Sequence, residues 1–423
     1  MAAPIHSKPS RIGGFDCILG NPPFLNQLET ATASNAHLAA IVNQRSGAML
    51  RGYTDLSATF LLFSAHILRD GGFLSMVQPQ SFLAAKDAGS VRRELLRVGS
   101  LDSLWISNEH VFDGAAVFTC APTIHIGGSR NGSLRRSATS KFIELPAMTL
   151  DNNELASAET WAHLAAAASG VPEISLDSHK RISELATATA DFRDQYYGLD
   201  GFLVEHADIA DSKKSDSDFP KIVTTGLIDL AECKWGTTST RILKRKWIAP
   251  RIDRRRMECD GTLGPWLTVR SCAKIMLATQ TRVIELLVDE QGVLIPSLPI
   301  VTVVPKDPED LWKVAAALAS PVASAVALCR YAGAAMATDA IKMSAKQVVG
   351  LPMPSDSGLW EQGAAILREA HCATLEDSRL ALLKRFGVAL CGAYGLTSEV
   401  ADNVHSWWWK RLAGKLAEVI PDA

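Results

Sequence analysis

Two consecutive prolines after a short apolar run constrain the fold more than any other feature of this chain. Residues 15–20 have the sequence FDCILG, and Asn21, Pro22, Pro23 and Phe24 follow directly. Proline has no backbone N–H group, so a β-ladder does not continue through two of them. The pattern predicts a buried strand over residues 15–20 that ends in a stiff loop presenting carbonyl oxygens.

The next hundred residues alternate between helical and strand patterns. Apolar residues at spacings of three and four predict a helix over residues 54–69, and the glycine pair in 69–72 is a helix stop; the apolar residues are Leu56, Phe60, Phe63 and Ile67. A second helix is predicted over residues 81–99, with strands over 73–79 and 101–108 and a turn followed by a strand within 111–128. This alternation predicts an α/β fold on a mostly parallel, doubly wound sheet.

The pattern changes near residue 150. Residues 151–190 are rich in Ala and Ser and predict a helical connector. The mixed pattern of residues 191–355 predicts an α+β domain, in which the polar stretch 210–220 forms an exposed loop. Residues 356–423 predict a helical C-terminal region. We therefore expect four regions, 1–150, 151–190, 191–355 and 356–423.

The composition is ordinary for a globular protein and argues against several kinds of site. The net charge is −2, so a polyanion would have to meet a local basic patch. The eight cysteines form no CxxC pair and no HExxH motif occurs, so we expect no metal. The N-terminus lacks the apolar core of a signal peptide, and no apolar run approaches the ~20 residues of a membrane span. These features predict a cytoplasmic protein.

A basic run lies in the second half of the chain. Residues 241–256 hold eight Lys and Arg residues and a single acid, Asp253. Such clusters bind phosphates, and Arg can also read guanine in the major groove. The alternatives are a solvated charged loop, or ion pairs with acids elsewhere in the chain. We predict DNA contacts from Lys244, Arg245, Lys246, Arg251, Arg254, Arg255 and Arg256.

The Asn-Pro-Pro-Phe loop has its own chemistry. The Asn21 amide oxygen and a proline carbonyl can accept two hydrogen bonds from a planar exocyclic amine, while Phe24 stacks on the ring that carries it. Two acceptors push such a nitrogen toward tetrahedral geometry and make it a nucleophile. Adenine, or less often cytosine, has an amine of this kind. The alternative is a plain turn, because Asn before Pro favours turns.

The stretch FDCILGNPPF resembles the catalytic motif (D/N)PP(Y/F/W) of the amino-group DNA methyltransferases of restriction–modification and phage-defence systems. It is most similar to the adenine-N6 branch, which carries a C-terminal target-recognition domain. The resemblance extends over most of residues 12–354, although only the NPPF loop is highly specific. It implies a partial Rossmann-like methyltransferase sheet, an α+β target-recognition domain and C-terminal helices.

The resemblance also implies roles for individual residues. Asn21, Pro22, Pro23 and Phe24 would be the catalytic loop that receives an adenine flipped out of double-stranded DNA, with S-adenosylmethionine as the methyl donor. Phe112 matches a second aromatic residue that closes the base pocket, or packs in the core. Asp55 and Phe60 fall where the family borders the cofactor, although a core role for Phe60 is equally consistent with the sequence.

The family places a strand and a glycine-rich turn for the cofactor before the NPPF loop. Only twenty residues precede Asn21, and they contain no such turn. We expect a split enzyme, in which a second chain supplies the S-adenosylmethionine half and the two sheets join edge to edge. The alternatives are a non-catalytic DNA-binding subunit and a permuted enzyme, but no downstream glycine cluster supports permutation. An RNA or protein amino-methyltransferase is a further alternative.

Overall fold

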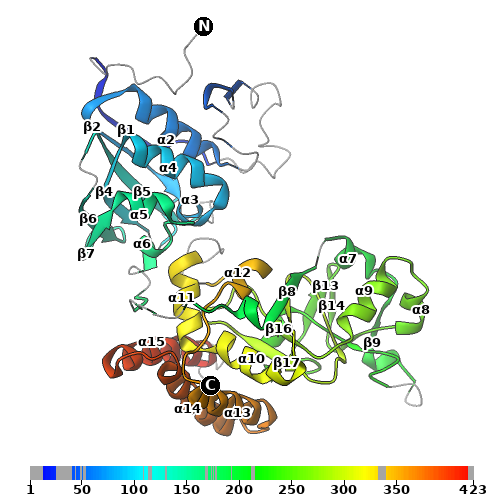
Figure 1. Cartoon of the computed structure of the whole chain (residues 1–423). Coiled ribbons are helices and arrows are strands. Elements are labelled where there is room, and N and C mark those ends of the chain that lie inside the picture. Colours follow the sequence, from blue (N-terminus) through cyan, green and yellow to red (C-terminus); the bar gives the residue numbers. More distant parts are fainter. Residues whose placement is uncertain are drawn as a thin grey trace. The chain divides into compact units, whose positions relative to one another are not determined.

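The computed structural model describes most of the chain, as two compact units. The described residues are 13–24, 41–42, 44–47, 50, 54–107, 109–112, 117–128, 131–166, 170–172, 174, 176, 179–191, 193–210, 215–331 and 340–417. The first unit comprises Met1–Val171 and Leu328–Ala340, and the second comprises Pro172–Ala327 and Ile341–Ala423. Figure 1 shows the helices and strands of each unit.

A mixed sheet forms the first unit. Its strands run in the order β1-β2-β5-β4-β6-β7, with β3 also paired to β5. Only the pairs β1–β2 and β4–β6 are parallel, and the pairs β2–β5, β3–β5, β4–β5 and β6–β7 are antiparallel. The strands are β1 (Phe15–Gly20), β2 (Leu68–Met76), β3 (Gln78–Pro79), β4 (Gly99–Ile106), β5 (Thr119–Ile126), β6 (Asn131–Ala138) and β7 (Ile143–Asp151).

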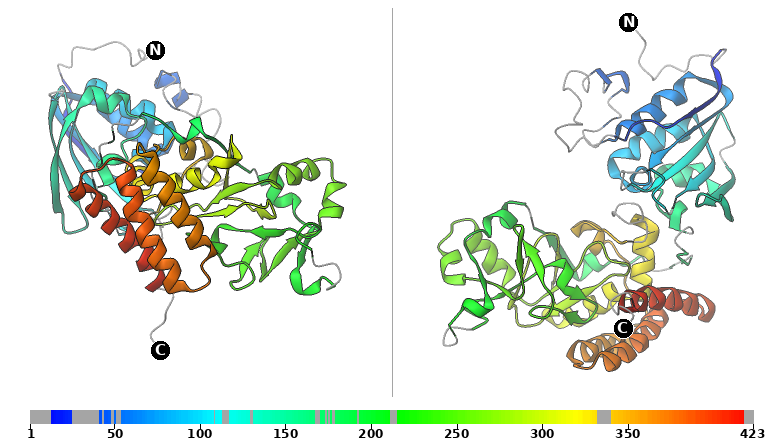
Figure 2. Two further views of the ribbon diagram at one scale, coloured as in Figure 1. Left: turned by 60° about the horizontal axis from the view of Figure 1, so that its bottom comes forward. Right: turned by 180° about the vertical axis from the view of Figure 1, so that it is seen from behind.

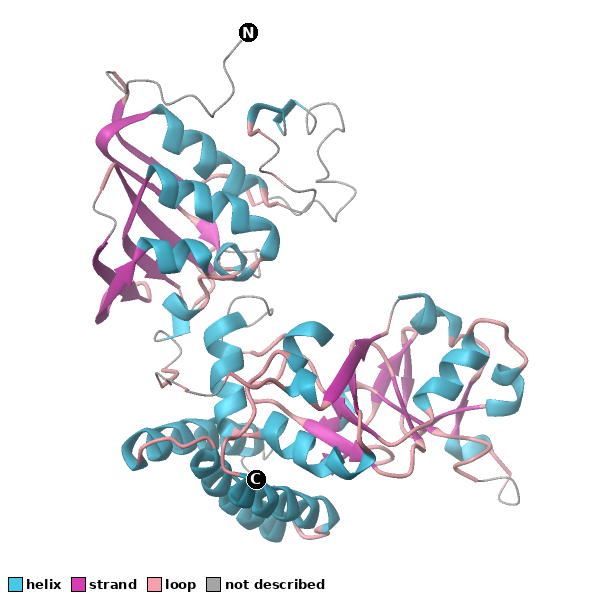
Figure 3. Ribbon diagram, viewed as in Figure 1, coloured by secondary structure: helices cyan, strands magenta, loops and turns pink. Residues whose placement is uncertain are grey.

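The α/β fold class is confirmed, but the prediction of a mostly parallel, doubly wound sheet is wrong. The connections from β4 to β5 and from β6 to β7 are loops without a crossover helix, so these neighbours pair antiparallel. The described helices of the first unit pack on one face of its sheet (Figures 1 and 3). On the other face Phe73 stacks on His125, with ring centroids 4.5 Å apart, and no described helix covers them.

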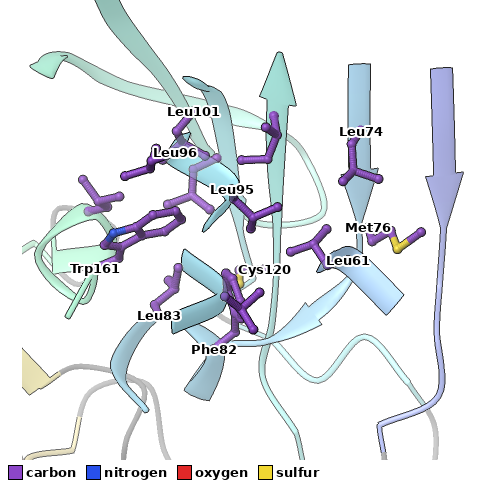
Figure 4. Packing of buried hydrophobic residues seen from close by; sticks show 14 of the residues in the cluster. Leu61, Leu74, Met76, Phe82, Leu83, Leu95, Leu96, Leu101, Cys120 and Trp161 are labelled. Atoms are coloured by element: carbon purple, nitrogen blue, oxygen red, sulfur yellow. The ribbon is translucent and has the colours of Figure 1, made fainter. Parts of the chain in front are cut away.

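Helices α2 (Leu56–Ile67), α3 (Ser81–Ala84), α4 (Gly89–Val98) and α5 (Asn152–Ser157) bury one continuous core with the sheet. Figure 2 shows α2 and α4 side by side over the strands. In Figure 4, Leu61 of α2 lies with Leu74 and Met76 of β2, and Trp161 lies at the other end of the cluster. The core residues of these strands alternate with residues on the opposite face, as a sheet covered on one side requires.

The predicted helix over residues 54–69 is confirmed as α2, but the apolar residues that predicted it do not form its buried face. The buried face consists of Ala58, Leu61, Leu62 and Ala65. The predicted stripe lies outside this face, and its members Phe60 and Ile67 are 45% and 53% exposed. The glycine pair does not end the helix: α2 ends at Ile67, and residues 69–72 form an irregularity within β2, where Gly71 has φ 79°.

The predicted helix over residues 81–99 is broken at Ala85, whose backbone is extended. The buried Arg92 side chain holds the break, because it donates hydrogen bonds to the carbonyls of Phe82 (2.6 Å), Ala85 (2.9 Å) and Glu159 (3.0 Å). Burial lowers the pKa of Arg92 to about 10. Three carbonyls, and not a carboxylate, therefore satisfy this buried cation.

Strand β1 is present as predicted, but it is not buried. It pairs with β2 alone among the described strands, so its other edge is open. Phe15 and Leu19 are 60% and 75% exposed. The apolar run therefore predicted a strand correctly, but its residues contact little of the described core.

The second unit contains two four-stranded sheets, β18-β10-β15-β9 and β17-β16-β19-β8, and two hairpins, β11–β12 and β13–β14. The strands are β8 (Ala186–Ala190), β9 (Leu203–Glu205), β10 (Lys221–Val223), β11 (Ile228–Asp229), β12 (Glu232–Cys233), β13 (Thr240–Ile242), β14 (Arg245–Trp247), β15 (Pro250–Ile252), β16 (Lys274–Leu277), β17 (Leu286–Asp289), β18 (Leu294–Pro296) and β19 (Val301–Pro305).

The remaining helices fall into two groups. Short helices α6 (His163–Ala166), α7 (Arg193–Gly198), α8 (Arg254–Glu258), α9 (Leu263–Arg270), α10 (Leu311–Ala319), α11 (Pro321–Tyr331) and α12 (Ala345–Val349) are followed by the long helices α13 (Ser357–Cys372), α14 (Glu376–Ala393) and α15 (Ser398–Ala417). The helical C-terminal region is confirmed. The helical connector is wrong in part, because Ala186–Ala190 is strand β8. No single described helix is long and apolar enough to cross a membrane. The bent pair Pro308–Ala319 and Pro321–Tyr331 reaches that length and hydropathy only when both helices are taken together.

A buried ion pair ties β16 to β17 in the second unit. Lys274 and Asp289 are cross-strand neighbours, both are buried, and Lys274 Nζ lies 2.5 Å from Asp289 Oδ2. Asp289 also accepts hydrogen bonds from the backbone N–H groups of Val293 (3.1 Å) and Leu294 (2.9 Å). The pair therefore fixes both the strand pairing and the turn that follows.

We expect Asp289→Ala to lower the free energy of unfolding by about 3–5 kcal/mol, because it leaves the Lys274 ammonium buried without a counterion. The exposed pair Lys313–Glu361, at 2.8 Å, is the matched control. Glu361→Ala should cost less than about 1 kcal/mol. Urea unfolding followed by circular dichroism compares the two variants, and similar losses would contradict the prediction.

Candidate active site and nucleic-acid interface

The Asn-Pro-Pro-Phe loop leaves the sheet where the β1 ladder stops. The Val77 N–H donates to the Gly20 carbonyl (3.0 Å), and Asn21 is the next residue. Asn21 is exposed, Pro22 is buried and Phe24 is half-buried. No residue in the described part of the chain hydrogen bonds with the Asn21 side chain.

The structure brings Phe112 to this loop. Phe112 lies in the connection between β4 and β5, and its ring meets Phe24 edge to face, with centroids 6.0 Å apart and planes at 74°. Both side chains are half-buried. A half-buried aromatic pair near an exposed amide can hold a flat ring that has polar groups at its edge.

Asp55 has a structural role at the start of α2. It is the N-cap of α2 and accepts hydrogen bonds from the Ser57 N–H (2.8 Å) and the Ser57 hydroxyl (2.6 Å). Burial raises the pKa of Asp55, and the two bonds from Ser57 oppose that shift. The alternative of a core role for Phe60 is wrong, because 45% of this residue is exposed on the outer face of α2.

Sequence reasoning missed two buried glutamines next to the loop. Gln78 donates to the carbonyls of Ser57 (3.2 Å) and Val77 (3.0 Å), which joins the start of α2 to the segment that holds Gly20. Gln80 is also buried and bonds the connection that carries Phe112. The available signal was two amide side chains, on either side of Pro79, within an otherwise apolar stretch.

The basic run forms an exposed hairpin and a short helix in the second unit. Strands β13 and β14 pair through a two-residue turn, in which Leu243 and Lys244 have φ values of 51° and 64°. Two positive φ values are the geometry of a type I′ turn, which rarely takes a side chain such as Leu. The Leu243 N–H donates to the Tyr196 hydroxyl (2.9 Å), which anchors the turn.

The hairpin exposes four cations, for which no ion pair occurs among the described residues: Arg241, Lys244, Arg245 and Lys246. Arg255 and Arg256 on α8 are also exposed. Arg255 lies 3.4 Å from Asp218, and the Arg256 guanidinium lies 6.0 Å from the Phe202 ring centre. These residues are accessible to a phosphate backbone.

Arg251 does not fit the predicted DNA contacts. It is 5% exposed, and its guanidinium bonds Asp216 (2.6 Å), the Phe219 carbonyl (2.5 Å) and His206 Nδ1 (2.9 Å). Arg254 is partly buried and bonds Ser271 Oγ (2.9 Å). Both arginines fit the alternative interpretation, in which basic residues of this run bond to groups elsewhere in the chain. A buried guanidinium needs such fixed acceptors.

Residues 5–112 match the family model described as Eco57I restriction-modification methylase. A putative type II restriction enzyme and methyltransferase from Methanocaldococcus jannaschii is 30% identical over 112 residues, which cover 26% of this chain and 9% of that relative. The predicted resemblance to methyltransferases of restriction–modification systems is thus confirmed, on the segment that contains Asn21.

Similar folds occur among solved structures. The type IIL restriction-modification enzyme MmeI, solved in complex with DNA, aligns over 95% of this chain and 57% of its own, with a TM-score of 0.54 and 13% identity. The type IIG restriction endonuclease BpuSI aligns over 94% of this chain and 54% of its own, with a TM-score of 0.35 and 12% identity. The MmeI likeness is one of fold, and this chain spans little more than half the length of either protein.

We expect Asp55→Ala to destabilise the first unit by about 1 kcal/mol through loss of the helix cap, and Asp55→Asn to cost much less, because Asn caps equally well. Urea unfolding of the two variants measures this. Equal losses in both variants would mean that the carboxylate charge, and not the cap, is what the fold requires.

Proposed function

We propose that this chain is the base-binding and DNA-recognition part of a DNA methyltransferase that acts on the N6 amine of adenine. The observation that carries the proposal is the Phe24–Phe112 pair in the loop that begins with the exposed Asn21. Its position at the end of β1, in a segment homologous to restriction-modification methylases, gives the loop a catalytic context.

The residues of this chain would activate the amine without a metal or a general base. The Asn21 amide oxygen and the Pro22 carbonyl would accept the two N–H bonds of an adenine flipped from double-stranded DNA. Phe24 and Phe112 would hold the ring. The missing N–H groups of Pro22 and Pro23 keep the loop from folding back into the sheet. Both acceptors draw the nitrogen lone pair out of the ring, which makes it nucleophilic.

S-adenosylmethionine would supply the methyl group, and the described residues make at most one side of its site. Phe60 is exposed and could contact an adenosine ring, whereas Asp55 already caps α2. No glycine-rich turn after a strand occurs in the described part of the first unit, so these residues do not form a cofactor site by themselves. We propose that a second protein chain supplies the remainder.

The open edge of β1 is where that chain would dock. Apolar side chains are exposed on β1 itself and on both faces of the sheet beside it: Phe15, Leu19, Phe60, Ile67 and Phe73. An open edge flanked by exposed apolar groups favours pairing with another sheet. A sheet that continued past β1, with helices on both faces, would cover all five residues.

DNA would be held by the exposed hairpin and by α8. Arg241, Lys244, Arg245 and Lys246 on the hairpin, with Arg255 and Arg256 on α8, are exposed and would contact phosphates or base edges. The bond from the Leu243 N–H to the Tyr196 hydroxyl would hold the hairpin backbone in place when DNA binds. The alternative function is a non-catalytic DNA-binding subunit, in which this interface works and the Asn21 loop does not.

Asn21→Ala is expected to lower methyl transfer by at least about 100-fold, because one of two acceptors that activate the amine is lost. DNA affinity should stay within about twofold, since the hairpin is untouched. Transfer of labelled methyl from S-adenosylmethionine to DNA, by this chain co-expressed with its genomic neighbour, is the measurement.

Asn21→Asp is the matched control for this experiment. It keeps a carbonyl-type acceptor at the same position, so it should retain more activity than Asn21→Ala. Full activity in Asn21→Ala would refute the catalytic role. Absence of transfer in the wild-type pair, with DNA binding intact, would favour the non-catalytic subunit.

Lys244→Ala combined with Arg245→Ala should weaken DNA binding and reduce the slope of log K against log salt by about 2, if each residue contacts one phosphate. The control is Arg368→Ala combined with Arg385→Ala on α13 and α14, which removes the same charge elsewhere. Fluorescence anisotropy over a salt series measures both slopes. Equal changes in the two double variants would indicate a general charge effect and no hairpin interface.

A further inference from the structure

The connection between β4 and β5 carries Phe112, and one side chain from a different part of the chain bridges its two ends. The connection leaves β4 after Ile106 and enters β5 at Thr119. The Ser107 N–H donates to the Thr119 carbonyl (2.9 Å), which closes the base of the loop. Ser107 and Thr119 are both buried.

Gln80 is the bridging residue. Its side-chain amide nitrogen donates to the carbonyls of Ser107 and Thr119, the latter at 3.2 Å, and its backbone N–H donates to the Phe118 carbonyl (2.8 Å). The residue is 5% exposed. Both hydrogens of one NH2 group are therefore used on two carbonyls that belong to opposite ends of the same loop.

Further contacts hold the described residues of this connection. The Ser107 hydroxyl donates to the Glu109 carbonyl (2.5 Å), and the His110 ring stacks on Phe118, with centroids 4.4 Å apart. Gln80 itself is held at the junction between β3 and α3. The position of Phe112 opposite Phe24 thus depends on a segment that contributes no ring to the pair.

The geometry points to Gln80 as a positioning residue that holds Phe112 opposite Phe24 and so sets the aromatic gap that receives the target base. The base-receiving part of this statement depends on the proposed methyltransferase function. The claim that Gln80 holds Phe112 in position does not depend on that function, because the hydrogen bonds concerned lie within the free protein. Loss of the amide would remove one donor from each of two buried carbonyls and weaken the connection between the loop ends, which would then rest on the bond from the Ser107 N–H to the Thr119 carbonyl.

Hydrogen exchange of the full chain without DNA tests whether Gln80 holds the ends of the loop in position. In Gln80→Met, which keeps the size but removes the donors, peptides containing Ser107 and Thr119 should exchange about ten times faster or more. The matched control is Gln78→Met, the same change two residues away, in a side chain that bonds α2 and not this loop. Its loop peptides should exchange as in the wild type.

Unchanged loop exchange in Gln80→Met, or equal acceleration in both variants, would overturn the proposal. Where Gln80→Met does not fold, Gln80→Asn replaces it, because the shorter side chain keeps an amide that cannot span both carbonyls. It should also accelerate exchange at the loop ends, and wild-type exchange in this variant would equally overturn the proposal.

A double-mutant cycle on kcat/KM for methyl transfer, in the co-expressed complex, tests the connection to Phe112. If Gln80 acts by holding Phe112, the double variant with Phe112→Ala should be no slower than Phe112→Ala alone. If the two substitutions instead lower kcat/KM by factors that multiply, Gln80 does not act through Phe112. If loop exchange behaves as expected but Phe112→Ala leaves methyl transfer unchanged, the aromatic pocket of the proposed function is what fails, and the Gln80 bridge remains.

Discussion

The parallel pairing of β1 with β2 is the interaction on which the candidate active site depends. It ends with the bond from Val77 to the Gly20 carbonyl, and the ladder cannot go further because Pro22 and Pro23 have no N–H groups. Asn21 therefore lies exposed at the end of the strand. Gln78 and Gln80 follow β2, and the pairing of β3 with β5 holds them where they reach α2 and the Phe112 loop.

Desolvation separates the cations of this protein into two functional groups. Arg92, Arg251 and Lys274 are buried, and each has fixed acceptors that offset the cost of removing a charge from water. The hairpin cations have no such acceptors among the described residues and keep their hydration until a partner arrives. Exposure, and not charge density along the chain, therefore selects the residues proposed to contact DNA.

The elements of the first unit could be predicted largely from local patterns, but their surroundings could not. Residues 15–20 and 54–69 form a strand and a helix as expected. Periodicity cannot choose between two apolar faces of one helix, so the sequence left open whether Phe60 lies in the core or at the cofactor. It likewise cannot give strand direction, which depends on whether a crossover helix joins two strands. The burial of Arg251 could not be predicted because its acceptors, Asp216 and the Phe219 carbonyl, are distant in sequence.

The sequence by itself determined the strand end at Asn21, the stiffness of the loop and its chemical groups, because these follow from covalent structure and local backbone preference. It also determined the resemblance to amino-group DNA methyltransferases, which rests on the same few residues. Only the tertiary structure decided that Phe112 meets Phe24, that Gln80 bridges the loop ends, and which arginines are exposed. Those outcomes depend on contacts between segments that are distant in sequence. Packing of these segments determines which side chains meet and which lose their hydration.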